Sequence, residues 1–594
     1  NSRIKAARSA LGDDGASQAQ IRTLHRTGYR FVGDVDELLA TDVNASPHTP
    51  AAVAARSANA PSTPNAPSVP ASFVGRPLRF AGAVLGLVLA VGAFSLLPRG
   101  VRDIGDSAAV ASSVPPRATP SKSLAVLPFK NLSADAAQEY FAEGVSAELL
   151  IVLSHLPDLH VSGRVSSSYF KGRTDPLPKV AETLGVANLL TGSVRRAEDR
   201  LRITVELVDG ASGYQLWSDS YDRELGDIFD VQDDIAANVA TALQVTLGLG
   251  ESGEIGMTRN VAAYDEFLRG TALYNERTPE SIPRAVEHMH RALALDPGFS
   301  RAWSYLYCIH LDGSSVVPGR AEEYTRKAVE ALEHARGLTP DAPFVRILSA
   351  REAMRRGDRL AAGAALDALP AGYWTADRYL TRDIFRGRTL IDAGFGKEAV
   401  DVLERARAAD PFSPPAAMYL ALAYAISGDS ANAFATIDRG VELGFLVPIL
   451  EGNAMLVALG TGDEDEIRRR VAALQPDAAG NNDALVAHLG DPTAARAELR
   501  RIAATPAPPD YVRSVVMAHW AAYFGDPELA LGELRNIAHA GLDEAALWRP
   551  VLSEVRKLPG FKDLVRSEGL VDYWRAYGWP DVCRPTAGDD FECT

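Results

Sequence analysis

The hydrophobic pattern changes its period once along the second part of the chain. Up to about residue 247, short apolar runs and alternating stretches are separated by amphipathic segments, whereas from about residue 262 only helical periodicity remains. The first of these regions predicts an α/β domain of about 125 residues. Its expected elements are strands at 123–129 and 159–165, helices at 139–156 and 176–185, a run of strands within 188–222, and a closing helix at about 228–247.

A recurring glycine marks the helical region. Six times a Gly precedes a small or aliphatic residue by five positions, at steps of 37, 34, 34, 28 and 35 residues. A tight Gly turn between two helices, with a small side chain where they cross, predicts a helical-hairpin repeat. The pairs are Gly357/Ala362, Gly394/Ala399, Gly428/Ala433, Gly462/Ile467, Gly490/Ala495 and Gly525/Ala530. The sequences Ala292–Pro297 and Ala406–Pro411 add the helix-ending Pro that is typical of such repeats.

An uncharged apolar segment precedes the α/β region. Phe80–Leu97 holds no charge over 18 residues and is flanked by Arg79 and Arg99. At about 1.5 Å per residue this length matches the hydrocarbon core of a bilayer, so we expect a transmembrane helix at 78–97. A buried helix of a soluble domain is the alternative. Gly82, Gly86 and Ala90 recur every four residues, which favours close approach of two such helices and hence a homodimer.

The amino-acid composition predicts two linkers, and the charge is distributed unevenly along the chain. The 594 residues suggest about three to five domains, and residues 38–77 and 98–121 look too poor in large apolar side chains to fold. The first 33 residues carry six basic and two acidic side chains, although the whole chain has a net charge of −15. This asymmetry favours a small polyanion-binding module joined to an acidic remainder. An ordinary solvated basic surface is the alternative.

The N-terminal segment resembles a DNA-binding fold. Ile21–Gly33, IRTLHRTGYRFVG, resembles the wing of OmpR/PhoB-type winged-helix domains, and NSRIKAARSALGDD before it resembles that family's recognition helix and loop. The resemblance implies that residues 1–37 are the C-terminal part of such a domain. Because the chain starts with Asn1 in what looks like the middle of a helix, we expect the earlier part of the domain to be missing.

Two further resemblances cover the remaining chain. SLAVLPFKNLSAD, EYFAEGVSAELL, LLTGSVRR and YQLWSDSYDRELGDIFDVQDDIA resemble the TolB-like N-terminal domain, which occurs in membrane-linked transcription regulators and adenylate-cyclase-associated proteins. The glycine repeats resemble degenerate tetratricopeptide repeats, and the whole order looks like a CadC-like membrane regulator. The expected fold class is multidomain: a winged-helix fragment (1–37), a disordered linker (38–77), a single transmembrane helix (78–97), a linker (98–121), a TolB-like α/β domain (122–248), an all-α helical-repeat solenoid (262–570) and a C-terminal tail (571–594).

The resemblance to a recognition helix implies which residues contact double-stranded DNA. Ile4, Ala7 and Leu11 share one helix face that would pack on the missing helices. Arg26, at the hairpin tip, is the candidate for a minor-groove or backbone contact. The expected DNA-binding residues are Asn1, Ser2, Lys5, Arg8, Ser9, Arg22, Arg26 and Thr27.

This interpretation also sets an expected location. Because DNA is cytoplasmic, residues 1–79 would face the cytoplasm and residues 98–594 the periplasm, in a protein that crosses the bacterial inner membrane once. An oxidising periplasm permits disulfides, and Cys583 and Cys593 are the expected pair in the tail. Cys308, within a helical repeat, is expected to be a buried thiol.

The sequence contains no catalytic or metal-binding motif that we recognise. No P-loop, GxSxG or zinc-type spacing is present, His288 and His290 point to different sides of a helix, and the serines of Arg164–Phe170 have no base nearby in sequence. The acidic groups in TGDEDE and GDDFE are expected to be solvated. We therefore expect no enzyme, no cofactor and no metal.

The expected function is a transcriptional regulator that couples an unidentified periplasmic signal to promoter binding. Two alternatives remain open. One is an envelope scaffold whose helical repeats bind proteins. The other is an adenylate-cyclase-associated regulatory protein, which is suggested by the company that TolB-like domains keep.

Overall fold

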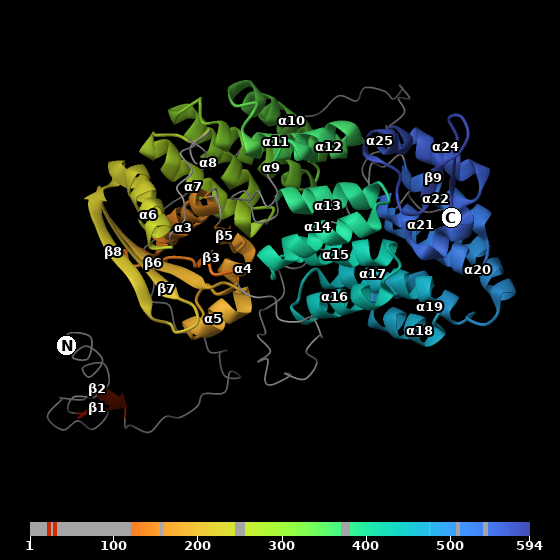
Figure 1. The fold of residues 1–594 in the computed structure, drawn as a ribbon, viewed down its shortest axis with the longest axis horizontal. Coiled ribbons are helices and arrows are strands. Elements are labelled where there is room, and N and C mark those ends of the chain that lie inside the picture. The colour runs from red at the N-terminus through yellow and green to blue at the C-terminus, as the bar shows by residue number, and fades with distance from the viewer. Residues whose placement is uncertain are drawn as a thin grey trace, which may run out of the picture. The chain divides into compact units, whose positions relative to one another are not determined.

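A computed structural model describes residues 21–24, 28–31 and 120–594, except for residues 155, 157–158, 244–255, 370–380, 475, 506–510 and 539–543. The chain divides into two compact units, residues 1–77 and 78–594, and each is described by itself. In the first unit the described residues form one antiparallel hairpin (Figure 1), in which β1 (Ile21–Leu24) pairs with β2 (Gly28–Phe31). This hairpin coincides with the segment that resembles a wing.

The described chain from Pro120 to Leu243 folds around a mixed sheet. The strand order is β5–β3–β6–β7–β8, and β4 pairs with β6. β3 runs parallel to β5 and β6, whereas β6, β7 and β8 form antiparallel pairs. The elements are β3 (Ser123–Val126), β4 (Lys130–Asn131), η2 (Ala136–Gln138), α3 (Glu139–Ser154), β5 (His160–Val161), α4 (Arg164–Tyr169), α5 (Leu177–Leu184), β6 (Asn188–Ala197), β7 (Arg200–Asp209), β8 (Gln215–Glu224), η3 (Leu225–Asp227) and α6 (Ile228–Ala242).

Side-chain alternation gives this sheet two buried faces. Leu124 and Val126 of β3 join the core that contains α3 and α6, whereas Ala125 joins the core that contains α5. A strand buried on both faces has a continuous apolar sequence, as SLAV does. The strand expected at 159–165 is short, because the chain turns at Gly163 and enters α4.

From Val261 onward the described residues form eight successive helix pairs. In Figure 1 these pairs follow one another from yellow-green to blue. The pairs are α7 (Val261–Glu276) with α8 (Ser281–Leu295), α9 (Ser300–Val316) with α10 (Ala321–Leu338), α11 (Pro343–Arg355) with α12 (Arg359–Asp367), α13 (Arg382–Asp392) with α14 (Gly396–Ala409), α15 (Pro414–Ile426) with α16 (Ser430–Glu442), α17 (Val447–Thr461) with α18 (Glu464–Ala473), α19 (Pro476–Val486) with α20 (Pro492–Ala504), and α21 (Tyr511–Tyr523) with α22 (Pro527–Ala538).

The glycine repeat is confirmed as the turn within these pairs. All six predicted glycines have φ between 73° and 89°, a left-handed conformation in which a side chain would be strained. The residue five positions later is fully buried in each of the six pairs. After five of the glycines, the next residue is an Asp whose side chain accepts a backbone N–H bond at the start of the following helix. A short sequence signal therefore sets both the turn and the helix crossing.

The α/β domain and the first helix pairs share one hydrophobic core. This core runs without interruption from Leu124 in β3 to Phe385 in α13. At the join, the rings of Phe229 (α6) and Tyr264 (α7) lie 5.1 Å apart between centroids, in an edge-to-face arrangement. The change of hydrophobic period near residues 248–262 therefore separates two kinds of secondary structure. The hydrophobic core nevertheless continues from one to the other.

The C-terminal part is compact and contains a second small hairpin. Its elements are η4 (Glu544–Trp548), η5 (Pro550–Leu552), α23 (Ser553–Arg556), α24 (Pro559–Ser567), α25 (Leu570–Tyr577), β9 (Cys583–Pro585) and β10 (Phe591–Cys593). β9 and β10 pair antiparallel with Cys583 opposite Cys593, and these two residues form a disulfide. The tail, which the sequence suggested to be a loop, is therefore a disulfide-closed hairpin, and buried Phe591 packs against Trp574 and Trp579.

The predicted fold class needs one correction. Among the described residues no helix is both long and apolar enough to cross a bilayer. Crossing takes about 20 apolar residues, whereas apolar helices such as α15 and α17 have 13 and 15 residues. The predicted span at 78–97, with Gly82, Gly86 and Ala90, lies outside the described residues. The single-pass inner-membrane topology, and with it the cytoplasmic and periplasmic assignment of the two ends, is therefore not supported.

The helix crossing makes a matched pair of variants possible in α16. Ala433 is fully buried at a crossing, whereas Ala435 is exposed on the same helix. We expect Ala433→Leu to destabilise the protein by about 1–3 kcal/mol through overpacking, and Ala435→Leu to change stability by less than about 0.5 kcal/mol. Urea denaturation followed by circular dichroism measures both. Equal midpoints for the two variants would contradict the crossing assignment.

Two buried histidines make stability depend on pH. Burial and, next in order, Arg549 lower the pKa of His519 to about 3, while burial and then Lys327 lower the pKa of His310 to about 4. In the unfolded chain histidine titrates near pH 6.5, so the unfolded state takes up protons that the folded state refuses. The stabilising contribution of each histidine is therefore complete above pH 6.5 and is lost as the pH falls from about 6.5 toward 4.

We expect His519→Gln to flatten the pH dependence of the unfolding free energy in this window by up to about 1.4 kcal/mol per pH unit. The matched control is His160→Gln, since His160 is exposed on β5. Denaturation curves recorded between pH 4 and 7 give the slopes. An unchanged slope in His519→Gln would show that this histidine is protonated in the folded protein.

Candidate functional site

The first candidate site lies where the α/β domain meets α7. The carboxylate of Asp265 on α7 accepts hydrogen bonds from Tyr140 Oη on α3 (2.7 Å), Arg196 Nη1 on β6 (2.6 Å) and Arg269 Nε on α7 (2.9 Å). Its side chain is 16% exposed. Burial opposes ionisation, yet these three donors hold the pKa of Asp265 below its usual value, and burial and Asp265 together raise the pKa of Tyr140. The charged carboxylate therefore ties helix, sheet and repeat together.

A second ion pair lies deeper in the same interface. Glu148 on α3 and Arg301 on α9 are 3.3 Å apart, with side chains 7% and 10% exposed. A cavity of about 20 Å³ beside them is lined by residues of α3, α7 and α9 and by Arg164. That volume has room for about one water molecule. The cavity is too small for an organic ligand, so this interface is suited to holding two parts of the chain together.

The other end of the α/β domain contacts the repeats through Ser166. The Ser166 backbone N–H donates to Asp410 Oδ1 (2.8 Å), the Ser166 hydroxyl also donates to that oxygen, and Phe412 N–H donates to Ser166 Oγ (2.9 Å). Gly163 N–H donates to the carbonyl of Ala409 (2.8 Å). Ser166 is fully buried and Asp410 is 2% exposed. The start of α4 is thereby fixed to the turn between α14 and α15.

Aromatic and aliphatic side chains surround this polar contact. Tyr169 stacks on Phe412 with ring centroids 4.3 Å apart, and Phe170 meets the same ring edge-on. Leu443 and Phe445, from the turn between α16 and α17, pack against the core of α5. The repeats therefore contact the α/β domain at two places, through α7 and α9 and through the turns around α15 and α16.

The serines of Arg164–Phe170 thus find their partner far away in sequence. Asp410 lies 244 positions from Ser166. Ser166 Oγ donates to this carboxylate and accepts a backbone N–H while fully buried, which leaves it no approach to a substrate. It serves as a structural hydrogen-bonding group.

The sequence signal nearest to this contact is the Asp-Pro pair, which by itself predicts only the end of a helix. Asp410 and Asp296 are the aspartates of the two Asp-Pro sequences that end α14 and α8. Asp296 likewise accepts a hydrogen bond from a hydroxyl that precedes it in the chain, that of Thr258 (2.5 Å). An Asp before such a Pro therefore binds a hydroxyl at both positions. Its partner residue cannot be found by spacing.

The predicted DNA-binding residues are mostly beyond what the structure describes. Asn1, Ser2, Lys5, Arg8, Ser9, Arg26 and Thr27 lie outside the described residues, and of Arg22 only the backbone is placed, opposite Arg30 in the hairpin. The disulfide pair Cys583 and Cys593 is the one predicted set that lies within the described residues and is brought together there.

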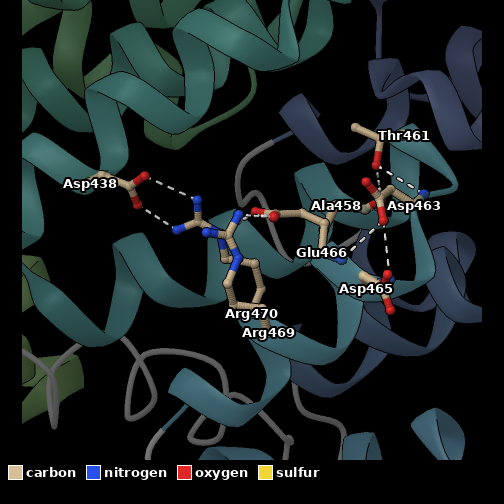
Figure 2. Close-up of polar contacts among 8 residues, drawn as sticks. All are labelled: Asp438, Ala458, Thr461, Asp463, Asp465, Glu466, Arg469 and Arg470. Carbon is tan, nitrogen blue, oxygen red and sulfur yellow. Dashed lines mark hydrogen bonds and ion pairs between the residues drawn. The ribbon is translucent and has the colours of Figure 1, made fainter.

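The acidic groups expected to be solvated are in part bound. Figure 2 shows the guanidinium of Arg470 between two carboxylates, bonded to Asp438 through two nitrogens (2.5 and 3.1 Å) and to Glu466 through Nε (2.7 Å). Asp463 accepts the backbone N–H groups of Asp465 and Glu466 and so caps α18. In the tail, Asp590 pairs with Lys562 and Arg566. Most of these carboxylates therefore stabilise helices and turns.

His288 and His290 have separate surroundings. His288 Nδ1 lies 2.7 Å from Glu266, while burial lowers the pKa of His290, which lies on another side of α8. Within the described ranges no group of three or more His, Cys, Asp or Glu is arranged to hold a metal ion.

Comparison with known proteins gives one sequence relative. The chain is 39% identical over 204 residues to "Putative adenylate cyclase 3" of Rhizobium meliloti (strain 1021), a match that covers 34% of this chain and 35% of that protein. The chain thus matches about a third of that relative's length. No protein-family model matches the chain. Lipoprotein GNA1162 from Neisseria meningitidis is 22% identical and is covered to 96%, over 20% of this chain, at a TM-score of 0.17.

These findings change the functional interpretation. The relative is named as an adenylate cyclase and not as a DNA-binding regulator, and the described residues contain no membrane-spanning helix. The prediction of a membrane-anchored, DNA-binding transcription regulator is therefore replaced. Over a third of its length, the chain is similar to a protein named as an adenylate cyclase.

The Ser166–Asp410 contact depends on the glycine before α4. A Cβ at Gly163 would overlap the carboxyl group of Asp410, whereas a Cβ at Gly226 would meet no atom within 4 Å. We expect Gly163→Ala to separate α4 from the α14–α15 turn and to speed exchange of the Ser166 and Phe412 amide hydrogens by about tenfold or more. Hydrogen exchange read by mass spectrometry measures this. Gly226→Ala is the control, and equal protection in both variants would refute the steric role of Gly163.

Proposed function

We propose that this chain is a non-enzymatic regulatory protein of the adenylate-cyclase-associated class, in which the helical repeats and the α/β domain act as one binding unit. The sequence match to the Rhizobium meliloti protein carries this proposal. Because the match covers about a third of each chain, cyclase activity is not transferred with it. We infer from the match only that the two proteins act in the same kind of signalling.

The two contacts between the α/β domain and the repeats support a regulatory role. A partner that binds the repeats and changes the packing of neighbouring helix pairs would act on the domain through α7, by way of Asp265, and through the α14–α15 turn, by way of Asp410. Helical repeats shift by small rotations at each interface, so binding is passed along them. The domain is held firmly enough to follow such shifts.

The surroundings of the buried polar groups support the non-enzymatic part of the proposal. Asp265, Glu148 and Asp410 each bind cations, hydroxyls or N–H groups of the chain itself. Groups used in this way hold the fold together and are not presented to a substrate.

A cAMP assay in bacteria that lack their own adenylate cyclase tests the proposal. The full chain expressed alone should give no cAMP. The Rhizobium meliloti protein should keep producing cAMP when its matched 204 residues are replaced by the matching residues of this chain, because a 39% identical segment preserves the same core.

The control is the same replacement by an unrelated helical segment of equal length, which should abolish the signal. Production of cAMP by the chain alone contradicts the non-enzymatic role. Loss of cAMP from the matched exchange, with the hybrid protein present at normal levels, contradicts the shared regulatory context.

A further inference from the structure

The outer edge of β8 is open in the described sheet. β8 is the last strand of the order β5–β3–β6–β7–β8 and pairs only with β7. It is ten residues long, and most of its side chains are exposed. An open strand of this length presents a row of N–H and C=O groups that another strand can bond.

Two side chains of β8 now occupy backbone groups of that edge. The N–H of Ser220 donates to Asp219 Oδ1 (2.7 Å), and the C=O of Asp222 accepts from Arg223 Nη1 (3.1 Å). Backbone groups two residues apart on a strand point to the same side. The backbone N–H and C=O groups of Ser220 and Asp222 therefore point away from β7, where exposed side chains of β8 itself bond two of them.

The pattern of charges on β8 is complementary to itself. When two copies of β8 pair antiparallel about Tyr221, Ser220 faces Asp222 of the second copy, and the outward backbone groups of these residues meet. In the same register Asp219 lies opposite Arg223, twice by symmetry. The structure places no acidic partner beside Arg223 and no basic partner beside Asp219 among the described residues. A register shifted by one residue loses this match, because Asp219 then lies opposite Asp222 in one direction and opposite Glu224 in the other.

The hydrogen bonds that pairing of two β8 strands would break are replaced by new ones. Pairing replaces the two side-chain-to-backbone bonds with strand-to-strand bonds and frees Asp219 and Arg223 to pair across the interface. Cross-strand pairs of opposite charge stabilise antiparallel strands, and like charges directly opposite destabilise them.

From this geometry we infer that β8 is a dimerisation strand that takes the β8 of a second copy of this chain in an antiparallel register centred on Tyr221. The sheet then continues through both copies with two-fold symmetry. The occupant is the same chain because the charge match requires both Asp219 and Arg223 to be present on the incoming strand.

Analytical ultracentrifugation of the full chain tests this inference. We expect a concentration-dependent dimer whose dissociation constant rises about tenfold or more in Arg223→Asp, because two attractive pairs become repulsive. The double variant Asp219→Arg with Arg223→Asp exchanges the charges and should return the dissociation constant to within about threefold of the original. Ser220→Pro should also weaken the dimer, because it removes an outward N–H and leaves the bonds to β7 intact.

Circular dichroism and the thermal midpoint establish that each variant is folded. A chain that stays monomeric at every soluble concentration overturns the inference. So does a dimer that is insensitive to Ser220→Pro and Arg223→Asp, or one that the charge exchange fails to restore. Binding of a strand from a different protein, without a dimer of this chain, overturns the second copy as the occupant.

Discussion

The sheet of the α/β domain completes its core only with the help of the first helical repeats. A sheet must bury each apolar face against another layer, and here α3 and α6 cover one face while being themselves covered by α7. Phe229 of α6 and Tyr264 of α7 meet within a core that continues to Phe385. Separating the two parts would expose this surface to water, at a cost of roughly 25 cal/mol per Å² of apolar area. The remaining contacts are arranged around this junction.

Polar groups give the junction its specific geometry. A buried charge is costly unless it is paired and hydrogen-bonded, and Asp265 satisfies its carboxylate with three donors from three elements. Ser166 and Asp410 do the same on the far side of the domain. Because each of these groups would be left unpaired in any other arrangement, the domain can sit against the repeats in only one way. The apolar core alone would tolerate several.

The proposed regulatory role is compatible with this arrangement. The helical repeats already bind one ligand, the chain's own α/β domain, by the turns and helix faces that such repeats commonly offer to partners. A domain held at two places moves with the repeats, and its free edge at β8 remains on the side where no described element covers it. Partner binding and self-association would then act on one body. The similarity to a protein named as an adenylate cyclase is compatible with the proposed regulatory role.

The sequence by itself determined the features that depend on neighbours in the chain. The glycine turns with their buried small residues, the strands of the sheet and the cysteine pair follow from spacing of a few residues, since local periodicity and turn chemistry act over that range. The N-terminal hairpin follows from the resemblance of Ile21–Gly33 to a wing. Only the tertiary structure decided what joins residues far apart. Asp410 meets Ser166 across 244 positions, and Asp265 meets Arg196 across 69. No periodicity links such pairs, because their proximity results from the packing of whole elements and not from the residues between them.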